Sequence, residues 1–494
     1  FRTLREDGYT DNEFADNDWS NRDSLSYLGS VRILPVDDVT IDLSGTWSNE
    51  HSRSRGGQCV TIRPSLLFRT VQQACELARP YDFSADTAGL TDVSSYGSWG
   101  TVAWDVGDAG PVQELTLKST TAWREQLSRL RQDLDMTAAT LSLAGNPFLA
   151  LDSTGDGDAG GEPGLQRQVS QEFQANASAA QGRVHFVAGA FTFWEDGDDT
   201  RTVTYNLGTS GTSTETRTEI DNLTWALYGQ ATWDFLDWAA ATVGLRYSSD
   251  RKEADQRVEV LGQSAPTYAS DQETFGAWTP MASLSLTTPH AWLDPTPIDH
   301  LVGYFTYARG FKGGGFNAVL NPQAGAALDP FDPEYLNSYE LGAKTLVFDN
   351  RLALNSALFL GKWDDQQVQA FETVGVGPGG VPQVQNLTLN AAESTIYGME
   401  VEFVALPTAE LRIEGSLGWL ETEYDEFERG VSFLDGSEID RSGESFDETP
   451  EIQTLLAAQY SFAAGGMPRP WLNGWVTPRL EWTYQSDVFY EGPE

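Results

Sequence analysis

Apolar and polar residues alternate with a period of two along much of the chain. Between residues 222 and 235, one set of alternating positions is apolar: Leu223, Trp225, Leu227, Gly229, Ala231, Trp233 and Phe235. The intervening positions are mostly polar and include Thr224, Tyr228, Gln230, Thr232 and Asp234. The same division recurs at 239–250, 338–347 and 411–419. Because successive side chains of a β-strand point to opposite faces, the pattern predicts strands with one apolar and one polar face.

The predicted strands are long. At about 3.3 Å per residue, the stretch from Trp225 to Phe235 extends roughly 33 Å, and a tilt of about 40° reduces its height to roughly 25 Å. That height matches the apolar band of an outer-membrane barrel with aromatic residues at its rims. Strands of a soluble β-sandwich also alternate, but they usually have only about five or six residues. The length therefore favours strands that cross a membrane.

Short turns and long polar loops alternate along the chain. Tight turns are predicted at 35–38, 108–111, 180–183, 236–238, 348–350 and 407–410, and the turn at 289–299 is longer. Long loops are predicted on the extracellular side at 48–98, 134–166, 196–221, 249–273, 312–335, 370–386 and 425–450. Short turns at one end and long loops at the other are typical of an outer-membrane β-barrel.

The segment 116–135 is the one place where a helix competes seriously with a strand. Its second half is rich in helix formers, but Leu117, Thr121 and Trp123 keep the period of two and the adjacent threonines favour a strand. We predict a strand that runs up into a loop. The chain then contains part of one strand at 1–7 and sixteen further strands, the last at 475–490. The predicted fold class is all-β, a transmembrane antiparallel β-barrel.

The charge balance limits the possible partners. The chain has 72 Asp and Glu against 31 Lys and Arg, which gives a formal charge of −41. Such a surface repels nucleic acid and attracts cations or cationic ligands. A role in binding nucleic acid is therefore excluded.

Histidine and cysteine are scarce, with four and two residues respectively, so zinc sites and Cys/His nucleophile pairs are poor hypotheses. Cys59 and Cys75 flank a short segment with a helical pattern, and an isolated pair at this spacing favours a disulfide over a metal site. A disulfide would indicate an oxidising compartment. The alternative is two unrelated free thiols. No stretch of 18 apolar residues is present, so no transmembrane helix is expected.

Several segments, in order, resemble the TonB-dependent outer-membrane receptors. LVGYFTYARGFKGGGFNA (301–318) resembles a strand and loop of that family, and FDPEYLNSYELGAKTLVFDNRLALNSALFLGKWDDQQVQAFE (331–372) resembles a strand, tight turn and strand. QNLTLNAAESTIYGMEVEFVALPTAELRIEGSLGWLETEYDEF (385–427) continues the resemblance, and WALYGQATWDF followed by VGLRYSSDRKE is similar to an earlier hairpin. The resemblance spans most of the chain and is strongest from about 167 to 430.

The family has an N-terminal plug domain, a short segment that engages TonB and a 22-stranded barrel. The resemblance implies that the predicted strands are the third through nineteenth of that barrel. We therefore expect this chain to lack the plug, the first two strands and the last three.

The resemblance also implies a function: TonB-dependent active uptake of a scarce ligand across the outer membrane, most commonly an iron–siderophore complex. No bond is made or broken in such transport, so no catalytic residue and no cofactor is expected. The implied partners are the TonB complex acting through the plug, a small-molecule ligand and outer-membrane lipid.

The segment YFTYARGFKGGGFNA (304–318) begins as a strand and ends in basic, aromatic and glycine residues. We expect the strand to leave the membrane here and the glycines to let the loop fold back over the mouth of the barrel. The candidate ligand-binding residues are Arg309, Phe311, Lys312 and Phe316. The two cations suit an anionic ligand such as a metal-loaded chelate; the alternative is that they pair with wall carboxylates such as Glu340. A nucleotide loop is disfavoured because GFKGGG lacks the Gly-Lys-Ser/Thr ending and no helix pattern follows.

The segment DSTGDGD (152–158) is a candidate calcium site. Asp152, Asp156 and Asp158 surround Gly157 as at the start of a calcium loop. At the twelfth position, where that loop requires a bidentate Glu, the chain has Pro163. The alternative is a solvated acidic loop.

Two other functions remain open from the sequence. A passive porin-like channel would have a similar wall, and only a plug would distinguish the two. A secreted, Trp-rich carbohydrate-binding β-protein is the second alternative, and solubility without detergent would support it. The identity of the ligand depends on loop shapes that the pattern does not give.

Overall fold

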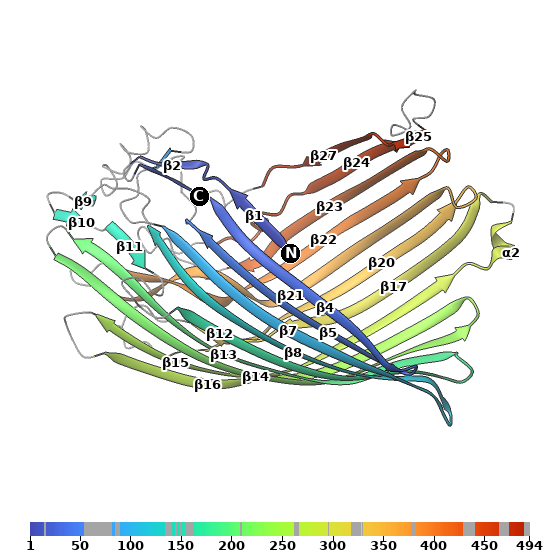
Figure 1. The fold of residues 1–494 in the computed structure, drawn as a ribbon, viewed down its shortest axis with the longest axis horizontal. Helices are drawn as coiled ribbons and strands as arrows, with labels where there is room; N and C mark the ends of the chain where they lie inside the picture. The colour runs from blue at the N-terminus through green and yellow to red at the C-terminus, as the bar shows by residue number, and fades with distance from the viewer. Residues whose placement is uncertain are drawn as a thin grey trace.

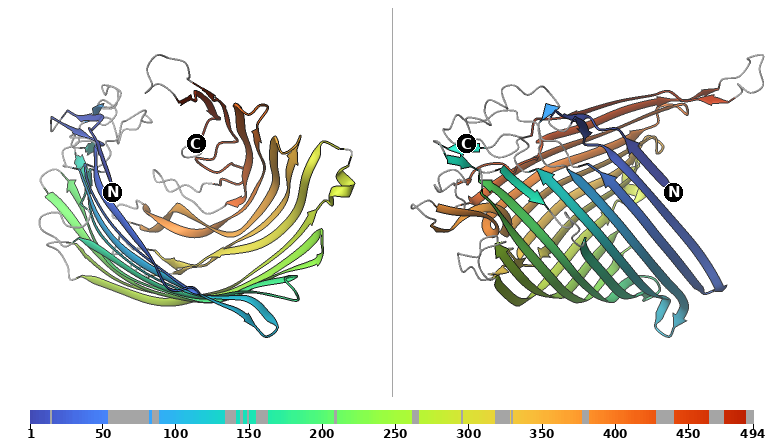
Figure 2. Two further views of the ribbon diagram at one scale, coloured as in Figure 1. Left: turned by 45° about the vertical axis from the view of Figure 1, so that its right-hand side comes forward. Right: turned by 60° about the vertical axis from the view of Figure 1, so that its left-hand side comes forward.

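The protein forms one large antiparallel sheet. The structure is a computed structural model that describes residues 1–13, 16–53, 82–83, 89–133, 141–143, 146–148, 150–154, 163–207, 210–260, 266–294, 296–317, 328, 330–376, 382–427, 440–463 and 474–488. Within these described residues, the sheet contains eighteen strands. The sheet is strongly curved. Its strands run diagonally in Figure 1, and it has a C-shaped section in the left view of Figure 2.

The wall of the sheet is made of strands that follow one another in the chain. They are β1 (Arg2–Glu6), β4 (Arg22–Val36), β5 (Val39–Ser52), β7 (Leu90–Ala109), β8 (Val112–Asp133), β12 (Gly164–Ala179), β13 (Val184–Leu207), β14 (Ser210–Leu236), β15 (Ala239–Val260), β16 (Thr267–Thr287), β17 (Ile298–Lys312), β20 (Glu334–Val347), β21 (Leu352–Val376), β22 (Pro382–Ala405), β23 (Leu411–Phe427), β24 (Ile452–Tyr460) and β27 (Arg479–Gln485). Each pairs with the next, from β1 with β4 to β24 with β27.

Smaller elements lie at the ends of the wall. They are β2 (Thr10–Asn12), β3 (Asn17–Trp19), β6 (Asp82–Phe83), β9 (Leu141–Leu143), β10 (Asn146–Phe148), β11 (Ala150–Thr154), β18 (Gly315–Phe316), β19 (Pro330–Phe331), β25 (Phe462–Ala463), β26 (Trp475–Val476) and the short helix α2 (His290–Leu293). Strand β11 pairs with β8 and β13 and is the eighteenth strand of the sheet. In the described part of the chain, no helix is long and apolar enough to cross a membrane.

The prediction of an all-β, antiparallel architecture is confirmed. The wall strands number one short strand at the start and sixteen more, as the period-two pattern predicts, and the segment 116–135 is a strand within β8. The longer turn at 289–299 differs from the other turns because it contains α2.

Three ranges expected as loops are strands instead. Residues 196–207 and 210–221 pair residue by residue, from Asp196 with Asp221 to Leu207 with Ser210. Residues 250–258 pair with 267–275, and 370–376 pair with 382–387. The expectation was wrong because it treated loss of the apolar alternation as loss of the strand. Where both faces of a hairpin meet water, alternation is not required, and β-branched residues such as those of RTVTYNLGTSGTSTETRTEI still favour a strand.

The two faces of the wall differ in exposure and chemistry. We call the face that carries Leu227 and its equivalents the apolar face. Its large side chains are exposed although they are hydrophobic, for example Leu227 at 57%, Val243 at 60% and Leu341 at 56%. Aromatic rings run along one margin of this face, with Trp225 and Tyr247 5.5 Å apart and Tyr247 and Trp278 4.8 Å apart between centroids. An exposed apolar face with an aromatic margin matches the lipid-facing surface of a membrane barrel.

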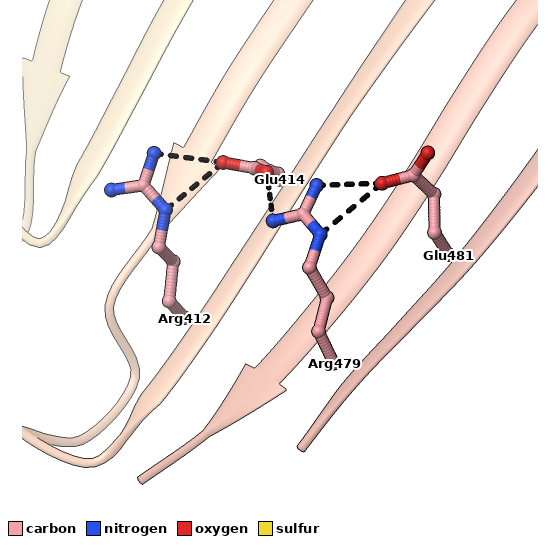
Figure 3. A network of polar contacts seen from close by, with 4 residues as sticks. All are labelled: Arg412, Glu414, Arg479 and Glu481. Carbon is pink, nitrogen blue, oxygen red and sulfur yellow. Dashed lines mark hydrogen bonds and ion pairs between the residues drawn. The ribbon is translucent and has the colours of Figure 1, made fainter. Parts of the chain in front are cut away.

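At the end of the wall with the short turns, four charged side chains form a ladder on the opposite, polar face (Figure 3). Arg412 donates to Glu414 Oε2 from Nε (2.9 Å) and Nη2 (2.7 Å), and Arg479 Nη1 donates to Glu414 Oε1 (2.6 Å). Arg479 also donates to Glu481 from Nε (3.1 Å) and Nη2 (2.8 Å). In the register, Ala457 of β24 lies between Glu414 and Glu481, and it is 1% exposed. The small side chain on the middle strand lets Arg479 reach over it to β23.

The face assignment predicts that an added charge will be costly on one face only. Leu227→Arg places a cation on the apolar face and should lower the free energy of unfolding in lipid by about 2 to 4 kcal/mol. Gln230→Arg is the matched control on the polar face of the same strand, and it should change that free energy by less than about 1 kcal/mol. Urea titration of both variants in lipid vesicles measures the difference. Equal losses would contradict the assignment.

Candidate functional site

The chain after β17 folds back onto the polar face. We call residues Gly313–Asn317 the crossing segment. Its backbone is held from both sides: Lys252 Nζ of β15 donates to the Gly314 carbonyl (2.6 Å), and Gln367 Nε2 of β21 donates to the Gly313 carbonyl (3.0 Å). Asn317 Nδ2 donates to the Thr388 carbonyl (2.8 Å) of β22 and Asn317 Oδ1 accepts from the Thr388 amide (2.7 Å). Because β15 and β22 lie five strands apart in the sheet, the contacts span about 24 Å of wall at about 4.8 Å per strand.

The glycines of the crossing segment are required for close contact. A Cβ on Gly313 would lie 2.5 Å from Asp250 Oδ2, and one on Gly315 would lie 2.7 Å from the Phe331 ring. A Cβ on Gly314 would lie 2.2 Å from the Phe331 carbonyl oxygen and 2.5 Å from the Phe275 ring. These distances are shorter than van der Waals contact, so only glycine fits. The triple glycine therefore fixes the segment against the wall.

The four residues predicted to bind ligand lie on different faces. Lys312 Nζ is 3.5 Å from Glu334 Oε1, and the Glu334 side chain is 7% exposed. Lys312 therefore pairs with a wall carboxylate, as the alternative interpretation expected, but the partner is Glu334 and not Glu340. Phe316 packs with Ala254 and Leu328. Both lie with the crossing segment, near the polar face. The Arg309 guanidinium and the Phe311 ring instead lie against Tyr335, at 4.3 Å and 6.3 Å.

Glu340, the expected partner of the cations, has another partner. Tyr304 Oη donates to Glu340 Oε1 (2.6 Å), and the Tyr304 ring lies flat over Gly342, where a Cβ would be 2.3 Å from the ring. A similar arrangement recurs at Tyr228 of β14, three strands from β17 along the wall. Tyr228 lies over Gly189, where a Cβ would be 2.4 Å from the ring, and its Oη donates to Glu172 (2.8 Å). The glycines let both rings lie along the wall.

A cavity of about 370 Å³ opens on the polar face beside the crossing segment. Its polar side chains are Thr224, Arg246, Ser248, Asp250 and Thr279, and it is also lined by residues 309–311 of β17. The cavity lies where β16 and β17 separate: their pairing ends at Met281 and Ala308 in the described chain. The next residue of β16 is Pro280, which has no amide to donate to a further ladder bond.

Arg246 is the most informative side chain in this cavity. Its Nε donates to Ser248 Oγ (2.9 Å), and its guanidinium lies 5.6 Å from the Phe191 ring and 5.8 Å from the Tyr228 ring. No carboxylate within the described ranges forms an ion pair with it. Glu172 accepts a hydrogen bond from Tyr228 Oη (2.8 Å). Aromatic rings hold the cation in place and leave its charge unneutralised.

Asp250 gives the cavity a negative group as well. Its Oδ1 accepts from Thr224 Oγ1 (2.6 Å), and its Oδ2 lies 3.7 Å from Lys252 Nζ. The cavity therefore offers one free cation, one partly neutralised carboxylate and several hydroxyl groups. Such a set suits a polar ligand with an anionic group.

Sequence reasoning missed Arg246, Tyr228 and Glu172 as a group. Each lies at a polar position of a period-two strand, but they belong to β15, β14 and β12, and only the pairing register brings them together. The one local signal for this group was an arginine at a polar position of a strand whose neighbour is rich in aromatic residues.

A second cluster lies beyond the end of β23. Arg441 donates to Asp447 Oδ2 and Oδ1 (3.0 and 2.9 Å) and to Glu444 Oε2 (2.9 Å). The hydrogen bonds that Arg441 donates to the Asp447 carboxylate raise the pKa of Arg441 above its usual range. Its guanidinium also lies 5.4 Å from the Tyr424 ring. All its polar contacts are internal, so this cluster fixes residues 440–450 and is not a candidate ligand site.

The disulfide and the calcium site stay predictions. Cys59, Cys75, Asp156 and Asp158 lie outside the described residues. The backbone of Asp152 is part of β11 and pairs with Thr204 and Asp133. Across the ranges that the structure covers, no group of three or more His, Cys, Asp or Glu side chains is placed to hold a metal ion.

Comparison with known proteins gives one family match and many similar folds. The family model described as TonB dependent receptor-like, beta-barrel matches residues 3–493. The ferric yersiniabactin uptake receptor FyuA from Yersinia pestis is 15% identical, with a TM-score of 0.69, over 97% of this chain and 62% of FyuA. The siderophore receptor PiuA from Acinetobacter baumannii is 14% identical, with a TM-score of 0.64, over 97% of this chain and 69% of PiuA.

The copper transporter OprC is 11% identical, with a TM-score of 0.59, over 93% of this chain and 59% of OprC. At these identities the similarity concerns the fold alone. The chain spans about three fifths of the length of FyuA and OprC.

The close contacts of the crossing segment predict a strong effect of one methyl group. Gly314→Ala should displace the segment at a cost of about 1 to 3 kcal/mol, so amides of Gly313–Asn317 should exchange at least about fivefold faster. Gly310→Ala is the control, because no atom lies within 4 Å of the added Cβ. Hydrogen exchange followed by mass spectrometry measures both. Unchanged exchange in the Gly314 variant would show that the segment is not packed as described.

Proposed function

The chain belongs to the TonB-dependent receptor-like β-barrel family, and from that premise we propose that it is the wall of a receptor for TonB-dependent uptake of a scarce ligand. Proteins of this family are outer-membrane β-barrels, so the apolar face is the lipid-facing surface and the polar face lines the lumen. The observation that carries the proposal is the family match over residues 3–493 on a wall whose exposed large apolar side chains share one face. Transport of this kind makes and breaks no bond in the ligand.

The wall and the lumen groups have separate tasks in this proposal. Antiparallel pairing satisfies the backbone within the lipid, where an unpaired amide costs several kcal/mol. The lumen groups contact the ligand and whatever occupies the lumen. Energy coupling through TonB and a plug domain remains an expectation about the whole protein.

We propose a metal chelate with anionic groups as the cargo. Two of the similar proteins are named as siderophore or ferric chelate receptors, and a third as a copper transporter. The cavity at Arg246 supports this class, since in a chain with a formal charge of −41 a lumen cation that pairs with no carboxylate among the described residues favours an anionic group. These three proteins, each 11 to 15% identical to this chain, share its fold but are named for ferric yersiniabactin, a siderophore and copper. The fold therefore does not determine which metal chelate is bound.

The two alternatives are weaker on specific grounds. A passive porin-like channel has a similar wall, but it does not require a segment held across the lumen side by contacts to β15 and β22. A secreted carbohydrate-binding β-protein would meet water with the apolar face, where Leu227, Val243 and Leu341 are each more than half exposed.

Cargo is tested directly by growth. Iron-limited cells that carry the intact gene should grow on at least one member of a panel of ferric chelates on which cells without the gene do not grow. The growth should stop when the proton gradient is discharged or TonB is removed. Rescue that persists without TonB would support the passive channel, and no rescue by any chelate would point to another cargo.

Arg246 provides a residue-level test on the chelate that restores growth. Arg246→Gln removes the lumen cation and should raise the Kd for that chelate at least about tenfold, because hydrogen bonds to charged groups contribute about 1.5 to 3 kcal/mol. Arg183→Gln is the control: it lies at a short turn and pairs with Asp237 (3.1 Å), so its Kd should not change. Equilibrium binding to purified protein measures both. An unchanged Kd in the Arg246 variant would place the ligand elsewhere.

A further inference from the structure

The pairing between β16 and β17 ends while both strands continue. The last ladder pair joins Met281 to Ala308. Beyond it, β16 remains paired with β15 as far as Thr267, and β17 remains paired with β20 as far as Lys312. We call residues 276–280 of β16 and 309–312 of β17 the unpaired edges. The wall therefore separates here between two strands that are each held on their other side.

The edge of β16 is closed to a further strand. Above the unpaired edge, the Gln272 amide donates to Asp271 Oδ1 (2.7 Å), and the Thr274 amide donates to Glu273 Oε1 (3.2 Å). Both amides lie on the same side of β16 as the position of Pro280, because alternate residues of a strand direct their amides to the same side. Carboxylates along an edge hinder the pairing of another strand. A strand is therefore not the missing partner of this edge.

The cavity of about 370 Å³ at Arg246 lies at this separation. Thr279 of β16 lines it, and residues 309–311 of β17 all border it, so the cavity reaches the edge of β17 as well as its polar face. The ladder pair of Met281 and Ala308 bounds the separation on the side of the short turns. On the other side the crossing segment bounds it, because Gly314 lies against the Phe275 ring.

The lipid-facing surface beside the separation is aromatic. Along β17, Tyr304 lies on the polar face, so alternation places Phe305, Arg309 and Phe311 on the lipid-facing surface. Phe305 is 46% exposed, and Trp278 on the β16 side is 58% exposed. The two strands thus present aromatic rings to lipid on either side of the place where their pairing ends.

The pairing ends at the level where the hydrocarbon ends. From Ile298 at the turn end of β17 to Ala308 is ten residues, which is about 33 Å along the strand and about 25 Å in height at a tilt of about 40°. The apolar band of a barrel is about 25 Å tall. The rings of Tyr247 and Trp278, 4.8 Å apart, mark the aromatic margin beside the separation. The unpaired edges therefore lie level with the polar heads of amphiphiles in the outer leaflet, and not in the hydrocarbon.

We propose that the cavity is entered between the unpaired edges by the anionic head of an amphiphilic cargo, whose acyl chain stays in the outer leaflet. The head meets Arg246 and the hydroxyl groups of Thr224 and Ser248, and the chain packs along Trp278 and Phe311. The inference rests on the proposed function, since it takes the cargo to be an anionic chelate and adds an acyl chain to it.

The geometry favours an amphiphile over a wholly water-soluble cargo. A cargo that arrives from water reaches the lumen through the mouth of the barrel and requires no separation of the wall at the lipid margin. An amphiphile already holds its head at this level, so the head moves sideways into the cavity and no charge crosses the hydrocarbon. The cavity volume also lies in the range of sites for small molecules.

The test follows the acyl chain by photochemical cross-linking. The whole protein in phospholipid nanodiscs is given a citrate–hydroxamate ligand loaded with Fe³⁺, which carries a long acyl chain with a diazirine near its carbonyl end. After illumination, mass spectrometry maps the cross-linked residues. Cross-links should concentrate on residues 276–281 and 305–311. Arg246→Gln should reduce them at least about tenfold, because the head then loses its charged hydrogen-bond donor, and Arg246→Lys should restore part of them.

The control variant is Arg183→Gln at a short turn, which should leave the cross-links unchanged. Cross-links spread evenly over the lipid-facing surface would show partitioning into lipid alone and would overturn the proposal. Cross-links confined to lumen residues such as Phe191 and Tyr228 would also overturn it, because the chain would then have entered with the head.

A second chelate separates this inference from the proposed function. It has the same head with an acetyl group in place of the acyl chain. TonB-dependent growth on the acetyl chelate, with no cross-links of the acyl chelate at the unpaired edges, would retain the proposed function and reject lateral entry. Cross-links at the unpaired edges, with no TonB-dependent growth on either chelate, would support lateral entry and count against the proposed function.

Discussion

The constraint on which the structure depends is that every backbone amide in the hydrocarbon must find its partner within the wall. Antiparallel pairing of neighbouring strands meets this requirement from β1 to β27. It also fixes side-chain direction, because a paired strand must place successive residues on opposite faces. The apolar alternation of the sequence and the lumen chemistry are thus two consequences of one hydrogen-bonding pattern.

The functional features lie where that pattern is relaxed. Pro280 coincides with the end of pairing between β16 and β17, and a cavity with a free arginine opens there. Beyond Lys312 the chain leaves the large sheet, and the crossing segment is held by the side chains of Lys252 in β15 and Gln367 in β21 and by the Thr388 backbone of β22. The cavity at Arg246 and the crossing segment therefore both lie near the place where the pairing between β16 and β17 ends.

The sequence predicts the wall well because period-two patterning is a local property. It located the strands and most turns, and it resolved 116–135 as a strand against its helix-forming composition. It failed at 196–221, where water on both faces removes the alternation although pairing continues. It also grouped Arg309 with Lys312 by closeness in the chain, whereas alternation and the register separate them onto opposite faces. Arg246, Tyr228 and Glu172 meet only through the register of four neighbouring strands, β12 to β15, which no local pattern encodes.

The central claim is that one set of alternating residues meets lipid and the other meets water. It is tested most directly by placing a nitroxide label at each position from Leu223 to Phe235 in turn, in lipid bilayers, and measuring access to oxygen and to a water-soluble nickel complex. The account predicts a period of two, with oxygen access highest at the odd-numbered positions, such as Leu223, Leu227 and Ala231, and nickel access highest at the even-numbered positions. A profile without alternation, or nickel access at every position, would contradict it.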